Sequence, residues 1–233
     1  MGAIRANLQA VSARIERAAR AAGRDPGAVR LLAVSKTHPA ALVDEAYQAG
    51  QIAFGENYVQ EGMRKMDALE RLPLEWHLIG PLQSNKARPA AERFAWVHTV
   101  ESERIARRLS AQRPETLPPL NVLVQVNISG EATKAGVAPQ QLRALAHAVA
   151  GLPRLRLRGL MAIPEPTPDR ALQRARFRAA RELFERLTAE GLALDALSLG
   201  MSDDLEAAIA EGSTLVRIGT AIFGARQSAR DAA

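Results

Sequence analysis

The chain of 233 residues contains no cysteine, and only 4% of its residues are aromatic. Without thiols it forms no disulfide, thiolate metal site or cysteine nucleophile, which favours a reducing compartment such as the cytoplasm. Because aromatic residues are so few, aliphatic side chains must fill the core. Hydrophobic residues make up 47% of the chain and charged residues 24%, a composition typical of soluble globular proteins.

Long apolar runs are also missing. Residues 1–23 alternate polar and apolar positions with helical period, so they match neither a signal peptide nor a membrane span. Ala6 stands where a myristoylation signal requires Ser or Thr. The net charge of +6 comes mainly from arginines on helical segments, and the basic stretches lack interleaved aromatic residues. We therefore expect a soluble cytoplasmic protein with no membrane or nucleic-acid partner.

Eight short apolar segments recur along the chain, each followed by a helical pattern. Eight strand–helix units joined by right-handed crossovers predict an α/β fold, a (β/α)8 TIM barrel, with an extra N-terminal helix over about 3–22. An open doubly wound sheet is the alternative, but no Gly-rich dinucleotide loop follows the first strand. No linker or repeat interrupts the pattern, so residues 1–233 are expected to form a single domain. Strands are predicted near 31–35, 52–55, 75–79, 96–100, 121–127, 157–163, 194–199 and 215–218, and helices near 40–49, 58–70, 84–93, 102–112, 139–150, 169–190, 203–211 and 221–229.

The first predicted strand ends in a lysine, Lys36. Active sites of this fold lie at the C-terminal ends of the strands. Alternation places Lys36 on the same face as Leu32 and Val34. If that face is the barrel interior, desolvation lowers the pKa of the lysine and favours attack on carbonyl groups. A lysine whose charged group reaches solvent from the strand end is the structural alternative.

Polar segments follow strands seven and eight, where this fold commonly binds phosphate. "LSLGMSDD" supplies Ser202 as a predicted N-cap, and "VRIGTAIFGAR" supplies Gly219 and Thr220 at the next helix start. Capping alone explains each segment, but the two together predict a phosphate cup. Arg217 is expected to point into the barrel, where it needs an acceptor, either an interior carboxylate or a ligand atom.

Other strand ends are polar as well, and each has a structural explanation. Asn57 is a candidate turn residue, His77 a satisfied core histidine, and Lys86 and Lys134 solvated loop charges. Gln125 alternates with valines and is expected to face inward. No acid and histidine set has metal-ligand spacing, and no Ser-His-Asp order is apparent, so we predict no metal site and no hydrolase triad.

Together these segments resemble the pyridoxal-phosphate homeostasis protein family. The likeness runs in order from about residue 31 to 226, through "AVSKTHP", "FGENYVQE", "WHLIGPLQSNK", "VLVQVNISGEATKAG", "RGLMAIP" and "LGMSDDLEAAIAEGSTLVRIGTAIFGAR". The family is similar to the barrel domain of alanine racemase and carries pyridoxal 5'-phosphate (PLP) as a Schiff base on the lysine of its "SK" motif, here Lys36. The family often has lysine where this chain has His38, so a role that the family assigns to a second amine there does not carry over to this chain. It implies these further cofactor contacts: Ser202, Gly219 and Thr220 to the phosphate, Arg217 to the pyridine nitrogen, and Asn57 beside the ring.

The resemblance also implies a carrier rather than an enzyme. Arginine only donates hydrogen bonds, so Arg217 would leave the pyridine nitrogen unprotonated and the ring a weak electron sink. Racemisation needs acid and base groups on both faces of the substrate. Alanine racemase takes the second of these groups from another subunit and a separate β domain. This chain ends just after the predicted barrel, so we expect no such domain. Tyr47 and Tyr58 are the only tyrosines.

We therefore expect a monomer that buffers or supplies PLP in vitamin B6 homeostasis, with no catalytic residue and little or no turnover. PLP-dependent apo-enzymes are candidate recipients, because an incoming amine can displace the lysine. Lys86 and Lys134 are candidates for a secondary PLP contact or a release route. The rival hypotheses are a weak amino-acid racemase and a Schiff-base aldolase or phosphosugar enzyme.

Overall fold

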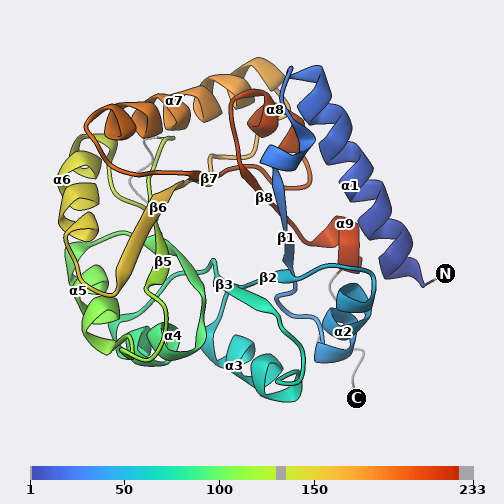
Figure 1. Ribbon diagram of the computed structural model, residues 1–233. Helices are drawn as coiled ribbons and strands as arrows, with labels where there is room; N and C mark the ends of the chain where they lie inside the picture. Colours follow the sequence, from blue (N-terminus) through green and yellow to red (C-terminus); the bar gives the residue numbers. More distant parts are fainter. Residues whose placement is uncertain (1, 130–134, 226–233) are drawn as a thin grey trace.

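The computed structural model describes residues 2–129 and 135–225 and contains a closed barrel of eight parallel strands (Figure 1). The strands follow one another around the barrel in chain order, and β1 pairs with β8 to close it. The predicted (β/α)8 fold is therefore confirmed, and every strand lies within two residues of its predicted bounds. The strands are β1 (Arg30–Val34), β2 (Ala53–Glu56), β3 (Glu75–Leu78), β4 (Trp96–Val100), β5 (Leu120–Gln125), β6 (Leu155–Met161), β7 (Ala196–Ser198) and β8 (Leu215–Ile218).

Helices surround the barrel and connect its strands (Figure 1). The helix predicted over 84–93 is divided into a 3-10 turn and a short α-helix, and the one predicted over 221–229 ends at Phe223, since Gly224 adopts a φ of 85°. Residues 226–229 lie outside the described part of the chain. The helices are α1 (Ala3–Ala21), η1 (Pro26–Ala28), α2 (Ala40–Gln48), α3 (Val59–Ala68), η2 (Ser84–Lys86), α4 (Ala87–Arg93), α5 (Glu103–Gln112), α6 (Pro139–Ala150), α7 (Arg170–Ala189), α8 (Leu205–Ala210) and α9 (Thr220–Phe223).

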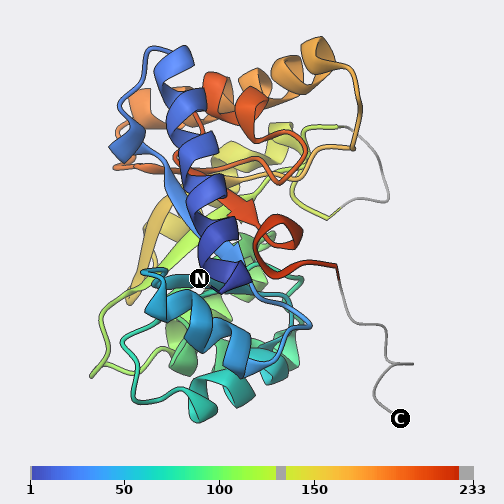
Figure 2. The same ribbon diagram turned by 90° about the vertical axis from the view of Figure 1, so that its right-hand side faces the viewer.

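The N-terminal helix α1 takes the place that a longer last helix would occupy. Its buried residues recur with helical spacing and form one apolar face: Ile4, Leu8, Val11, Ile15 and Ala19. This face packs against α8, α9 and α2, and Figure 2 shows α1 running along the side of the barrel beside the short α9. The last helix α9 has only four residues, and α1 lies on the outer side of the barrel near β1 and β8 (Figure 1).

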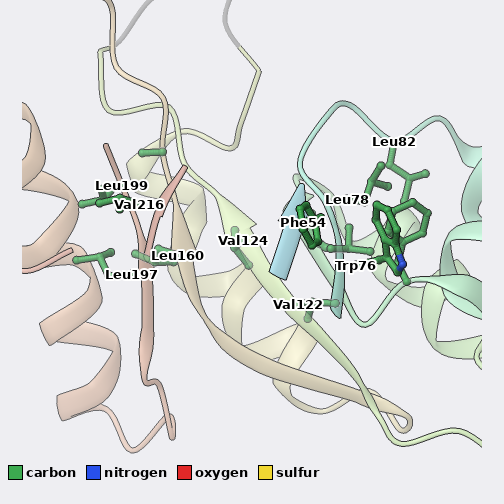
Figure 3. Close-up of a cluster of buried hydrophobic side chains, with 14 of the residues drawn as sticks. Phe54, Trp76, Leu78, Leu82, Val122, Val124, Leu160, Leu197, Leu199 and Val216 are labelled. Carbon is green, nitrogen blue, oxygen red and sulfur yellow. The ribbon is translucent and has the colours of Figure 1, made fainter. Parts of the chain in front are cut away.

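The core has an outer and an inner part, because alternate residues of each strand face opposite sides. The outer part lies between barrel and helices and is aliphatic with a few aromatic side chains (Figure 3); it includes Phe54, Trp76, Leu78, Val124 and Leu160. Inside the barrel there are two smaller apolar clusters, one formed by Leu32, Ala53 and Leu215 and the other by Trp96, Leu123, Met161 and Ala196. Polar side chains are buried among the remaining strand positions, and they define the site described below.

None of the helices in the described part of the chain combines the length and apolar character that crossing a bilayer requires.

Candidate functional site

A cavity of about 710 Å³ opens among the segments that follow the strands. It is lined by all six predicted cofactor-binding residues: Lys36, Asn57, Ser202, Arg217, Gly219 and Thr220. These residues lie as far as 184 positions apart in the sequence (36 to 220). Only the closure of β8 onto β1 brings the two ends of this set together.

Lys36 lies two residues after the end of β1 and reaches the cavity from the same face as Val34, which also lines it. The chain turns sharply after Lys36, because Thr37 adopts a left-handed φ of 67°. A residue with a Cβ rarely adopts this conformation, and it persists where the surrounding structure holds it.

Two side chains of α3 hold the backbone on either side of Lys36. Glu61 Oε1 accepts a hydrogen bond from the Thr37 amide at 2.5 Å, and Lys65 Nζ donates to the Ser35 carbonyl at 2.7 Å. We call Ser35, Glu56, Glu61 and Lys65 the Lys65 cluster. It fixes the turn that presents the amine of Lys36.

The Lys65 cluster is a buried set of ion pairs. Lys65 Nζ lies 2.7 Å from Glu56 Oε1 and 2.8 Å from Glu61 Oε1, and Ser35 Oγ donates to Glu56 Oε1 at 2.5 Å. Burial raises the pKa of Glu56, while Lys65 opposes this shift. Sequence reasoning missed Glu61 and Lys65. Their i,i+4 spacing was visible, but such a pair usually lies on a solvent-exposed helix face.

Arg217 on β8 is buried, and its partners are neutral oxygens. Its Nη1 donates to the carbonyl and to the hydroxyl of Ser198, both at 2.7 Å, and its Nη2 donates to the Ala162 carbonyl at 3.0 Å. Burial lowers the pKa of Arg217 to about 10, and the charge of Asp204 opposes this shift. The guanidinium therefore keeps its charge at neutral pH. The sequence suggested an interior carboxylate or a ligand atom as the acceptor. The acceptors within the protein are instead two backbone carbonyls and a hydroxyl group.

The loop after β7 differs from the prediction. Ser202 is not the N-cap of α8; that position belongs to Asp204, and Ser202 lies in the turn before it. The physical reason is that Asp204 Oδ1 accepts a hydrogen bond from the Met201 amide at 2.7 Å, which closes the loop and delays the helix. The Ser202 hydroxyl is thus not used as a helix cap, and Ser202 lines the cavity.

The loop after β8 passes close to β1. A Cβ on Gly219 would lie 3.1 Å from the Val34 carbonyl oxygen, so a side chain at this position would press against β1. Thr220 follows as the first residue of α9 and is exposed. Absence of a side chain at Gly219 keeps the cavity open between β1 and β8.

Arg14 of α1 also reaches the cavity. Its Nη1 donates to the Ser202 carbonyl at 2.7 Å, and its Nη2 donates to Glu206 Oε2, also at 2.7 Å. Sequence reasoning placed the helical arginines on solvent faces and missed this contact. No local pattern distinguishes Arg14 from its neighbours, since only the packing of α1 onto α8 selects it.

Asn57 is set in place by the loop after β3. A Cβ on Gly80 would lie 2.1 Å from the Asn57 carbonyl oxygen, so the two backbones meet where only glycine fits. Thr99 Oγ1 donates to the Gly80 carbonyl at 2.8 Å and fixes this loop in turn. Gln125 of β5 lines the cavity as well, in keeping with its expected inward direction.

Several residues considered from the sequence lie elsewhere. His38 is buried and its ring packs against Phe223, with ring centroids 5.2 Å apart. Lys86 is half-buried at the end of η2 and does not line the cavity. Lys134 lies outside the described residues. Tyr58 is 62% exposed at the start of α3, and neither it nor Tyr47 of α2 lines the cavity.

Comparison with known proteins identifies the family. The model of the alanine racemase N-terminal domain matches residues 6–227. A pyridoxal phosphate homeostasis protein from Pseudomonas aeruginosa is 64% identical over 226 residues, which cover 97% of each chain. The chain belongs to the pyridoxal phosphate homeostasis protein family. Another member, from Escherichia coli K12, is 56% identical over 232 residues, covering 97% of this chain and 98% of its own.

Solved structures of this family include PipY of Synechococcus elongatus, which has been determined with and without PLP. The PLP-bound form is 43% identical and superposes with a TM-score of 0.80, covering 90% of this chain and 99% of PipY. These relatives confirm the family resemblance that the sequence motifs indicated.

Proposed function

We propose that this chain binds PLP in the cavity through a Schiff base to Lys36 and acts in PLP homeostasis and supply, with little or no catalytic turnover. The observation that carries the proposal is the meeting of an amine, a buried guanidinium and the two loops after β7 and β8 around one cavity. The names of the relatives and the PLP bound to PipY support the same ligand.

The residues present fit PLP at its three polar ends. Lys36 offers a primary amine to the aldehyde, and their condensation forms a C=N bond and releases water without any redox change. Ser202 and Thr220 offer hydroxyl groups to the phosphate, and Gly219 leaves room beside β1. Arg217 offers a charged donor to the pyridine nitrogen, and Asn57 lies at the cavity wall.

The same residues argue for low turnover. PLP supplies an electron sink when its pyridine nitrogen is protonated. Arg217 keeps its proton at neutral pH because its pKa is about 10, so it would donate a hydrogen bond to the pyridine nitrogen without transferring the proton. Among the described residues that line the cavity there is no tyrosine or histidine to act as a second acid or base, and the carboxylate among them, Asp203, is exposed. We therefore propose storage and delivery rather than racemisation, and a recipient that is a PLP-dependent apo-enzyme. The cytoplasmic location and monomeric state stay predictions from the sequence.

The test is an absorption spectrum of the purified protein with PLP, followed by borohydride reduction and peptide mapping. Reduction converts the C=N bond to a stable secondary amine, and we expect the pyridoxyl group on the peptide that contains Lys36. Lys36→Ala should lose the label, whereas the control Lys86→Ala, outside the cavity, should keep it. A label on any other lysine would refute the assignment.

Two further measurements separate the carrier from its rivals. Steady conversion of one amino-acid enantiomer to the other by the wild type, lost in Lys36→Ala, would favour a racemase. Reactivation of a PLP-dependent apo-enzyme, faster from the loaded protein than from the same concentration of free PLP, is expected of a supplier. A protein that stays colourless after PLP addition would favour the aldolase hypothesis.

A further inference from the structure

A line of buried polar side chains crosses the barrel interior beneath the cavity. Arg217 Nη1 lies 2.7 Å from Ser198 Oγ, which lies 3.3 Å from His98 Nδ1. His98 Nε2 lies 2.9 Å from His77 Nδ1, and His77 Nε2 lies 2.8 Å from Glu75 Oε1. We call these five residues the interior line. They come from β8, β7, β4 and β3, so the line runs from the cavity across the barrel.

The two ends of the interior line determine the direction of every hydrogen bond in it. Arg217 can only donate, so Ser198 Oγ accepts from it and turns its own proton toward His98 Nδ1. His98 then carries its proton on Nε2 and donates to His77 Nδ1. His77 carries its proton on Nε2 and donates to Glu75, an ionised carboxylate that can only accept. Reasoning from either end assigns the same two tautomers.

This direction requires both histidines to be neutral. A proton added to His77 would sit on Nδ1 and face the N–H of His98 Nε2 across the 2.9 Å contact, and one added to His98 would sit on Nδ1 and face the hydroxyl proton of Ser198 across the 3.3 Å contact. The surroundings favour the neutral form, because both rings are fully buried and burial lowers the pKa of each histidine. The His77 ring also stacks on Trp96, with centroids 5.2 Å apart and planes 7° from parallel.

At the far end, Glu75 is anchored as a carboxylate. Hydrogen bonding to His77, with help from Arg30, lowers the pKa of Glu75 to about 2. Arg30 Nη2 donates to Glu75 Oε1 at 2.6 Å. The interior line therefore begins at the positive charge of Arg217 and ends at the negative charge of Glu75. These two charges fix the direction of its hydrogen bonds at neutral pH.

We propose that His98 is a positioning residue for Arg217, acting through Ser198 and held in its tautomer by His77 and Glu75. Because His98 Nδ1 accepts a hydrogen bond from the Ser198 hydroxyl, an oxygen lone pair stays directed at Arg217 Nη1. Two acceptors on Ser198 and one on Ala162 then fix the guanidinium plane. The remaining donors of Arg217 keep one direction toward the cavity. This inference rests on the proposed function, because these remaining N–H groups of Arg217 are the ones that we propose to donate to the pyridine nitrogen of PLP.

The first test uses the full chain without PLP. Nitrogen NMR of labelled histidine distinguishes protonated from unprotonated ring nitrogens, and the chain has only four histidines to assign. At neutral pH we expect His77 and His98 each to carry a proton on Nε2 alone. A proton on His98 Nδ1, or a doubly protonated ring, would overturn the proposal whether or not PLP binds.

The second test compares two substitutions of His98 by PLP titration and by the absorption maximum of bound PLP. His98→Asn keeps an acceptor near the Nδ1 position, whereas His98→Leu has a similar volume and no acceptor. We expect His98→Leu to bind PLP at least about tenfold more weakly and to shift the absorption band, because the Ser198 hydroxyl loses its acceptor and no longer holds a lone pair toward the charged Arg217. His98→Asn should stay within about threefold of the wild type, since the Ser198 hydroxyl keeps its acceptor.

Controls separate positioning from folding. His147→Asn removes a histidine from the surface of α6 and should change neither affinity nor band. If His98→Leu does not fold, Ser198→Ala takes its place, because it removes the hydroxyl with little loss of volume and should weaken binding similarly. A purely structural role would lower the melting temperature of both His98 variants without moving the band, and that result would refute the proposal. Failure of the wild type to bind PLP would instead refute the proposed function, while the NMR test would still decide the direction of the line.

Discussion

The Lys65 cluster makes a quantitative prediction, because it places a carboxylate where water does not reach. Glu56 has no exposed side-chain surface, and Lys65 is 7% exposed. Lys65→Met keeps the aliphatic stem and removes the charge. It leaves Glu56 with only the Ser35 hydroxyl as a donor. Removing one partner of a buried ion pair typically costs about 3–5 kcal/mol, a large part of the stability of an ordinary domain.

Urea unfolding of the wild type and Lys65→Met at pH 7.5 measures this free energy. The matched control is Arg107→Met, which breaks an exposed i,i+4 pair with Glu103 on α5 and should cost about 0–1 kcal/mol. The deficit of Lys65→Met should shrink as the pH falls. The reason is that the pKa of Glu56, already raised by burial, rises further without the lysine, so the carboxyl takes up a proton.

A double variant tests the reasoning itself. In Lys65→Met with Glu56→Gln the fully buried carboxylate is replaced by a neutral amide, so the double variant should be more stable than the single one. A cost below about 1 kcal/mol for Lys65→Met, or no recovery in the double variant, would refute the argument from a buried charge. PLP affinity measured on the same proteins shows whether the cluster also positions Lys36. We expect weaker binding by Lys65→Met, since the carbonyl before Lys36 loses its donor.

Two further predictions concern the barrel interior and the cavity wall. Because burial lowers the pKa of His77 and His98, the unfolded chain binds more protons than the folded one as the pH falls below about 6.5, and stability is lost there. Between pH 6.5 and 5 the loss of unfolding free energy is up to about 2 kcal/mol for each histidine. Urea unfolding should show a smaller loss for His98→Asn than for the wild type, because the variant has only one of these two buried histidines. Gly80→Ala should cost about 2 kcal/mol or more and weaken PLP binding, since its Cβ would meet the Asn57 carbonyl oxygen at 2.1 Å. Gly151→Ala, where the nearest atom lies 3.7 Å away, is the control, and equal costs at the two glycines by urea unfolding would contradict the prediction.

The interior line and the Lys65 cluster lie on opposite sides of the barrel wall and support different parts of the site. The cluster lies outside β2, where Glu61 and Lys65 reach back from α3 to the turn at Lys36. The interior line lies within the barrel and reaches Arg217. The amine and the guanidinium that we propose to hold PLP are therefore positioned by separate networks, and substitutions in one should leave the geometry of the other unchanged.

The sequence by itself determined the barrel and the residues around its cavity. Alternating apolar strands with helices between them predicted the fold, and period-two alternation placed Lys36 and Arg217 toward the interior. These predictions succeed because they depend on local patterns and on one rule of the fold, that parallel strands all end at the same face. Boundaries were less certain where loops close by side-chain contacts, as at Ser202, which precedes α8 because Asp204 bonds to Met201.

The tertiary structure alone decided what holds those residues in place. Lys65 lies 30 positions from Ser35, and Ser198 lies 100 positions from His98, so no local pattern marks either pair. It also showed that neutral oxygens of Ser198 and Ala162 accept from Arg217, where the sequence suggested a carboxylate or a ligand. The physical reason is that hydrogen bonds between side chains depend on distances of a few tenths of an ångström, and strand register and helix packing, which set these distances, arise only when the barrel closes.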